Sequence, residues 1–182
     1  MFLRLILLVA AATAALALSY IGVYAQTVFI DRSDVLIIAD ALTDGSPFPN
    51  QIVNPPFEPT ITVAGDAGRD HEITINIPDM DPTESGPRAG IREGIAAGAN
   101  VRVIFPQRAG IKNPRQAGPV LVDVRTSPGG PAAGVGLSIR PNTPGAAAEY
   151  EITFVAPANI PANSGTITII LDEDVQLPGV RD

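Results

Sequence analysis

The chain has 182 residues, a formal net charge of −7 and no cysteine. An acidic chain repels phosphate backbones, so we expect no nucleic-acid partner. Without cysteine the chain has no disulfide, no thiolate metal site and no cysteine nucleophile. Hydrophobic residues make up 46% of the chain but aromatic residues only 5%, so the core must consist of Val, Ile and Leu, which favour strands.

The N-terminus is typical of an export signal. A single charge at Arg4 precedes the apolar run Leu5–Leu18, and Val23-Tyr24-Ala25 offers a cleavage site. We predict a secretory signal peptide over residues 1–25 that is removed after Ala25. The alternative is an uncleaved anchor helix, since about 20 apolar residues span a bilayer. A pilin-type assembly helix is a third reading, although the acidic residue near the start of many pilins is missing.

Both main readings export the rest of the chain. We therefore predict an extracellular, cell-surface location, with membrane contact only through residues 1–25 if they are retained.

Beyond Ala25, apolar and polar residues alternate with a period of two. The isoleucines of His71–Ile77 share one face, as do the two valines and Phe105 of Asn100–Phe105 and the three valines of Val120–Arg125. One-sided alternation is typical of antiparallel sandwiches, whose strands pack one face and expose the other. Further strands are predicted at Val28–Ile30, Val35–Ala39, Thr60–Ala64, Val135–Arg140, Glu151–Phe154 and Thr166–Ile169.

Turn residues separate these runs, and no segment after Ala25 keeps a helical period. At most, Arg88–Ala99 could form a short helical turn. The sequence therefore predicts an all-β fold, an antiparallel β-sandwich that follows an N-terminal signal or anchor helix.

The stretch Ser127–Gly134 is rich in glycine and proline, which is typical of a linker. We predict a β-sandwich domain over residues 26–127, a linker over 128–134 and a partial second β unit over 135–182. The second unit offers only three clear strands, which would leave one sheet with a bare apolar face. It should therefore pack on the first domain, complete it, or pack on another copy of the chain.

Two stretches carry a family resemblance. The first runs from Gly98 through the turn AGIKNP at Ala109–Pro114 to Ser127, and the second begins with PNTPG at Pro141–Gly145 and ends near Pro178. Together they resemble the immunoglobulin-like β-sandwich repeats of large bacterial cell-surface and S-layer-type proteins. The resemblance covers about residues 60–182 and implies an extracellular location and a structural or adhesive role without catalysis. It implies cell-envelope proteins or copies of the chain itself as partners.

The order of the two stretches departs from that family, because the stretch that opens a repeat here follows the one that closes it. Three explanations remain open. The two parts could close on each other within one chain, as in a circular permutant. They could pair between successive molecules, head to tail, by strand addition. The chain could also be a truncated member with a partial last unit.

Two acidic clusters are candidate metal sites, because closely spaced carboxylates in loops can bind Ca²⁺, which takes six to eight oxygen ligands. Neither matches the twelve-residue EF-hand loop, and a solvated acidic loop is the alternative for both. Glu173 lies within the second cluster. The candidate calcium ligands are Asp79, Asp81, Glu84, Asp172 and Asp174.

We predict that the chain is not an enzyme and needs no organic cofactor. Its single histidine, His71, has no nucleophile elbow to serve, and a glycosidase would need more aromatic side chains around its paired acids. The glycine-rich Arg88–Ala99 lacks the Lys and Ser/Thr of a phosphate loop. The predicted function is an exported structural or adhesive module that self-associates through strand edges. The alternative is an extracellular domain that binds carbohydrate, or another ligand with the help of calcium.

Overall fold

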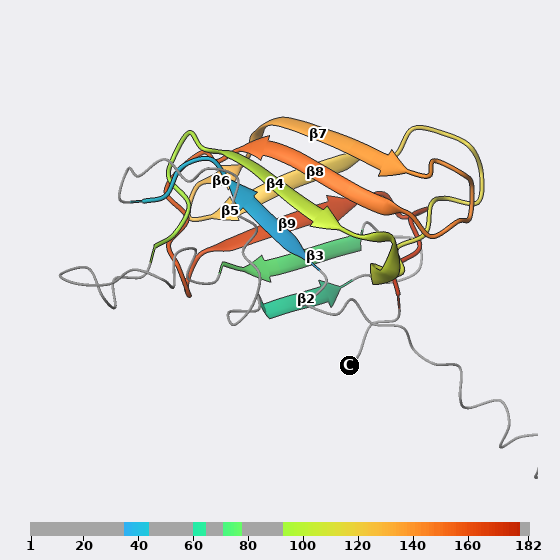
Figure 1. Cartoon of the computed structure of the whole chain (residues 1–182), viewed down its shortest axis with the longest axis horizontal. Coiled ribbons are helices and arrows are strands. Elements are labelled where there is room, and N and C mark those ends of the chain that lie inside the picture. Colours follow the sequence, from blue (N-terminus) through green and yellow to red (C-terminus); the bar gives the residue numbers. More distant parts are fainter. Residues whose placement is uncertain (1–34, 44–59, 65–70, 78–92, 179–182) are drawn as a thin grey trace, which may run out of the picture.

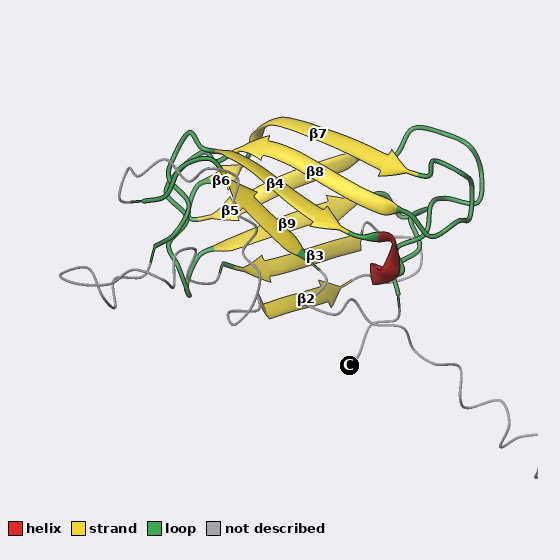
Figure 2. Ribbon diagram, viewed as in Figure 1, coloured by secondary structure: helices red, strands yellow, loops and turns green. Residues whose placement is uncertain are grey.

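The structure is a computed structural model that describes residues 35–43, 60–64, 71–77 and 93–178. Strands account for almost all of its regular structure, and the only helical element among these residues is the short 3-10 turn η3, Gln107–Ala109 (Figure 2). The signal or anchor segment 1–25 and the predicted strand Val28–Ile30 lie outside the described residues.

The strands form two antiparallel sheets that lie one above the other (Figure 1). The first sheet consists, in spatial order, of β1 (Leu36–Ala39), β4 (Asn100–Phe105), β8 (Glu149–Val155) and β7 (Ala133–Arg140). The second sheet consists of β2 (Thr60–Ala64), β3 (His71–Asn76), β9 (Thr166–Leu171), β5 (Val122–Ser127) and the two-residue β6 (Gly130–Pro131).

The alternation in the sequence places the core between the sheets, as predicted. Along β4, Val101, Val103 and Phe105 are fully buried, while Arg102 is exposed. The inner residues of the other central strands are equally buried, because side chains from both sheets interdigitate there. These are Ile73 and Ile75 in β3, Ile152 and Phe154 in β8, and Ile167, Ile169 and Leu171 in β9. The all-β sandwich prediction is confirmed.

The strands of the C-terminal part occupy the middle of both sheets. In the first sheet β8 pairs with β4 on one side and β7 on the other. In the second sheet β9 lies between β3 and β5, so that Ile169 faces Ile73 on one side and Val124 on the other. Both sheets therefore combine strands from residues 26–127 with strands from residues 135–182.

Residues 128–134, which read as a linker in the sequence, connect the sheets closely. After β5 the chain turns back through Pro128 and Gly129, pairs briefly with β5 as β6, and enters β7 at Ala133. The hydroxyl of Thr126 donates to the carbonyl of Pro128 at 2.9 Å and holds this turn. The chain thus crosses from the second sheet to the first at their shared side.

Gly94 marks a close approach between two chain segments. Its backbone lies against Ile160–Ala162, and a Cβ there would overlap the carbonyl oxygen of Ile160. We expect Gly94→Ala to destabilise the fold by about 1–3 kcal/mol, because the backbone must shift to make room. Gly118→Ala is the matched control, since the space around Gly118 is open. Equal melting temperatures for the two variants would contradict this packing.

Candidate functional site

The sandwich interior holds few polar side chains, and those described are hydrogen-bonded within the chain. The buried polar residues are Glu93, Asn113 and Thr126. Glu93 accepts a hydrogen bond from the Thr43 hydroxyl at 2.7 Å. Buried polar groups that have hydrogen-bond partners stabilise a fold.

Asn113 is the centre of a buried hydrogen-bond network. Its amide donates to the carbonyl of Pro141 at 2.8 Å and to the carbonyl of Thr143 at 2.9 Å. Its side-chain oxygen accepts a hydrogen bond from the hydroxyl of Tyr150 at 2.9 Å. Asn113 belongs to the AGIKNP turn, and Pro141 and Thr143 belong to the PNTPG turn. The AGIKNP turn and the PNTPG turn therefore meet through the side-chain amide of Asn113.

Burial raises the pKa of Tyr150 from 10.0 to about 12. Between pH 10 and about 12 the unfolded chain loses a proton that the folded chain keeps, so the contribution of Tyr150 to stability is present below pH 10 and is lost across that window. We expect the unchanged chain to melt at a higher temperature than Tyr150→Phe below pH 10. This difference should shrink as the pH rises to about 12, because the unfolded chain ionises at pH 10.0 and the folded chain only at about 12. A constant difference across that range would contradict the burial of this hydroxyl.

The candidate calcium ligands do not form a cluster in the part of the chain that is described. Asp79, Asp81 and Glu84 lie outside it. Asp172 and Asp174 lie in the turn after β9, where the amide of Asp172 donates to the carbonyl of Leu121. Within the described ranges, no three His, Asp or Glu side chains come close enough to hold a metal ion. Calcium binding by either cluster stays a prediction.

His71 begins β3 and pairs with Leu171 of β9. Its side chain is half-buried, and its neighbour Glu72 is exposed on the outer face of the second sheet. This is the position of a polar residue at the start of a strand.

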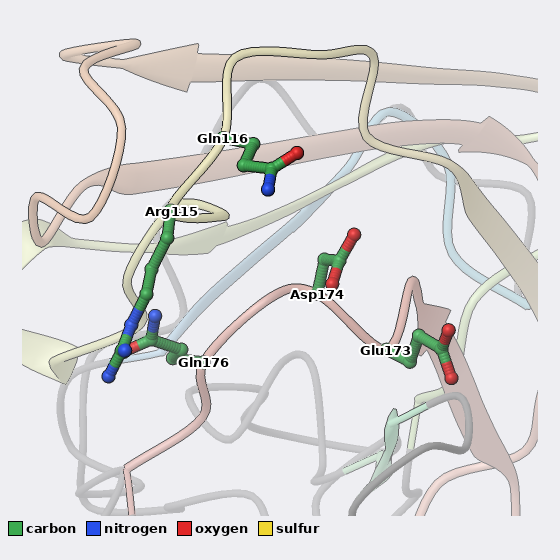
Figure 3. Close-up of a pocket in the computed structure, with 5 residues that line it drawn as sticks. All are labelled: Arg115, Gln116, Glu173, Asp174 and Gln176. Atoms are coloured by element: carbon green, nitrogen blue, oxygen red, sulfur yellow. The ribbon is translucent and has the colours of Figure 1, made fainter.

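An open hollow lies at one end of the sandwich, between the loop that leads to β5 and the turn after β9 (Figure 3). Its volume is about 460 Å³, and its lining residues are Arg115, Gln116, Glu173, Asp174 and Gln176. The carboxylate of Glu173 points away from Arg115 and Gln176. The five lining side chains carry charges of both signs and two amides, and none of them is aromatic.

Sequence reasoning missed the role of Asn113, although the turn containing it was recognised. Its hydrogen-bond partners lie 28 or more positions away in the sequence, and no local sequence pattern around Asn113 identifies them. The one signal that could have suggested it is the coincidence of a lone tyrosine in a core strand with an Asn-Pro turn.

In residues 35–43, 60–64, 71–77 and 93–178, no helix has the length and apolar character needed to cross a bilayer. Comparison of the chain with protein-family models, with curated proteins and with solved structures finds no match.

Proposed function

We propose that this chain is an exported, non-catalytic module of the cell surface with a structural or adhesive role. The sandwich is of the immunoglobulin-like type that the resemblance to bacterial surface repeats implies. Its partners are cell-envelope proteins or further copies of the chain, which it contacts through strand edges.

The observation that supports this proposal best is the chemistry of the interior. The inner faces of β3, β4, β8 and β9 carry aliphatic and aromatic side chains that are at most 2% exposed. The buried polar groups described here are engaged in hydrogen bonds within the chain. A closely packed domain of this kind is rigid and presents a stable outer surface, and a structural or adhesive module needs both properties.

The outer faces agree with a surface role. On the second sheet the outward residues of β3 and β9 include three threonines, and Thr74 and Thr168 are joined by a hydrogen bond between their hydroxyl groups at 3.2 Å. On the first sheet Arg102 and Glu151 form an ion pair at 2.8 Å. These faces are polar and ordered, so strand edges are left as the main sites for association.

The proposal is tested by locating the protein in the cells that make it. Because the chain has no cysteine, a Ser127→Cys variant carries one exposed thiol at the end of β5. We expect a membrane-impermeant maleimide to label it in intact cells. We also expect the protein to stay with the envelope fraction through high-salt washes and to leave it in denaturant.

Ile75→Cys is the matched control, because Ile75 is fully buried and its replacement should react only after unfolding. If Ser127→Cys is protected in intact cells and reacts only after lysis, the proposal of an exported surface module is wrong.

A further inference from the structure

The strand β7 leaves one edge of the first sheet open. It pairs with β8, and among the described residues no strand pairs with its other side. Natural sheets commonly protect such edges with charges, prolines or bulges. Residues Gly136–Arg140 carry no proline and a single charge, at Arg140, and they pair with β8 in regular register.

The core is also incompletely covered along this edge. The inner residues of β1, β4 and β8 are at most 2% exposed. By contrast, the inner apolar residues of β7 remain partly exposed. So do Val122, the first residue of β5 in the second sheet, and Val120, which precedes that strand. We call this strip the β7 seam; it consists of Val120, Val122, Val135, Leu137 and Ile139.

We propose that two copies of this chain join along β7, antiparallel and edge to edge, about a two-fold axis at Ser138. The four strands of the first sheet in each copy then form one continuous sheet, and the two β7 seams meet beneath it. This inference rests on the proposed function, of which it specifies the edge, the partner and the register.

The register follows from the ends of the regular segment. On one side, pairing with β8 shifts between Ala133 and Gly136, and Gly134 has a left-handed φ of 62°, so the strand is bulged there. On the other side, Pro141 has no N–H to donate. Only a two-fold axis at Ser138 pairs all of Gly136–Arg140 with itself and leaves both irregular ends outside.

This register is self-complementary, as a two-fold interface requires. It sets Ser138 opposite Ser138, and Leu137 of one copy opposite Ile139 of the other within the seam. The largest side chain, Arg140, comes opposite Gly136, which has none. Cross-strand pairs of these kinds are favourable, and no two like charges face each other.

Charge complementarity supports the same arrangement. On the outer face β8 carries Glu149 and Glu151, which pair in register with Arg140 and Ser138 of β7. Arg140 is exposed, and in the joined sheet it lies opposite Gly136 of the other copy. The residue beyond Gly136 on β8 is Thr153, and Glu151, which is in an ion pair with Arg102, lies at the diagonal position. Opposite charges are thereby brought nearer across the interface.

Disulfide formation in the full chain, held in mild detergent, tests this inference. Residues opposite each other in an antiparallel pair have Cα atoms about 4.5–5.5 Å apart, which a disulfide can bridge. We expect Ser138→Cys to give a covalent dimer under mild oxidation. Thr153→Cys is the matched control, because it lies on the same face but one strand further in, opposite Gly136. Three strand spacings and four residues along the strand direction place it about 20 Å from its counterpart. We expect it to stay monomeric.

A second variant needs no oxidation. Ser138→Lys sets two ammonium groups against each other at the axis, and we expect it to weaken dimerisation by about tenfold in sedimentation experiments. Equal cross-linking of Ser138→Cys and Thr153→Cys, or an unchanged dimer with Ser138→Lys, would overturn the β7 interface. Either result would leave the proposed function standing, because cell-surface labelling at Ser127 measures it separately.

Discussion

A chain that lacks residues 135–182 will show no cooperative unfolding transition. The deletion removes β8 and β9, the central strands of the two sheets, together with most of β7. It takes away ten buried residues of the core, where truncation of even one large side chain costs about 2–5 kcal/mol. These residues are Ala148, Tyr150, Ile152, Phe154, Ala156, Ile160, Ile167, Ile169, Leu171 and Val175. The summed loss of stability exceeds the free energy of unfolding of a typical domain, which is about 5–15 kcal/mol.

The measurement is thermal or urea unfolding followed by circular dichroism. Adding the separate fragment 135–182 should restore a cooperative transition, since it carries the missing strands. A truncated chain that melts as the full chain does, and remains monomeric, would contradict the shared core.

Asn113→Ala will be the most damaging polar substitution in the described part of the chain. It leaves the carbonyls of Pro141 and Thr143 and the hydroxyl of Tyr150 without their partner. With a net contribution of about 1 kcal/mol for each of the hydrogen bonds, we expect a loss of about 3 kcal/mol. For a domain of this size that corresponds to a fall in melting temperature of about 6–12 °C.

Asn142→Ala is the matched control, because Asn142 is exposed and lies between Pro141 and Thr143 in the turn that Asn113 contacts. Its change in stability should be within about 0.5 kcal/mol. The double variant Asn113→Ala with Tyr150→Phe should lose less than the sum of its parts, since both remove the same hydrogen bond. Equal stabilities of Asn113→Ala and Asn142→Ala would show that the network contributes nothing.

The individual strands were predictable because each depends on a local pattern. The alternation in Asn100–Phe105 and His71–Ile77 identifies both the strand and its buried face, and the structure agrees at each inner residue. Such a pattern predicts which face of a strand is buried. It carries no information about the neighbouring strand, which depends on contacts far away in the sequence.

The position of β9 illustrates that limit. Thr166–Ile169 reads as a strand, but nothing in it distinguishes an edge from the centre of a sheet, where it lies between β3 and β5. The two-residue β6 could not be found, because Gly130 and Pro131 show no alternation and favour a turn. The open edge of β7 likewise emerges only once its neighbours are known.

The candidate sites were harder to predict for the same reason. Asp172, Glu173 and Asp174 are adjacent in sequence, but adjacency alone does not bring carboxylates together in space, and the described residues contain no group of three such side chains placed to hold a metal ion. The network around Asn113 is the reverse case, in which residues distant in sequence converge on one side chain.

Hydrogen exchange of the full chain, read by mass spectrometry of peptides, tests the central claim most directly. If strands from both parts of the chain share one core, the amides of Thr166–Leu171 and Glu149–Val155 should be among the slowest to exchange. They should open together with those of His71–Asn76 and Asn100–Phe105, in one cooperative step. Rapid exchange of Thr166–Leu171 while Asn100–Phe105 stays protected would show that the C-terminal strands are not part of the core.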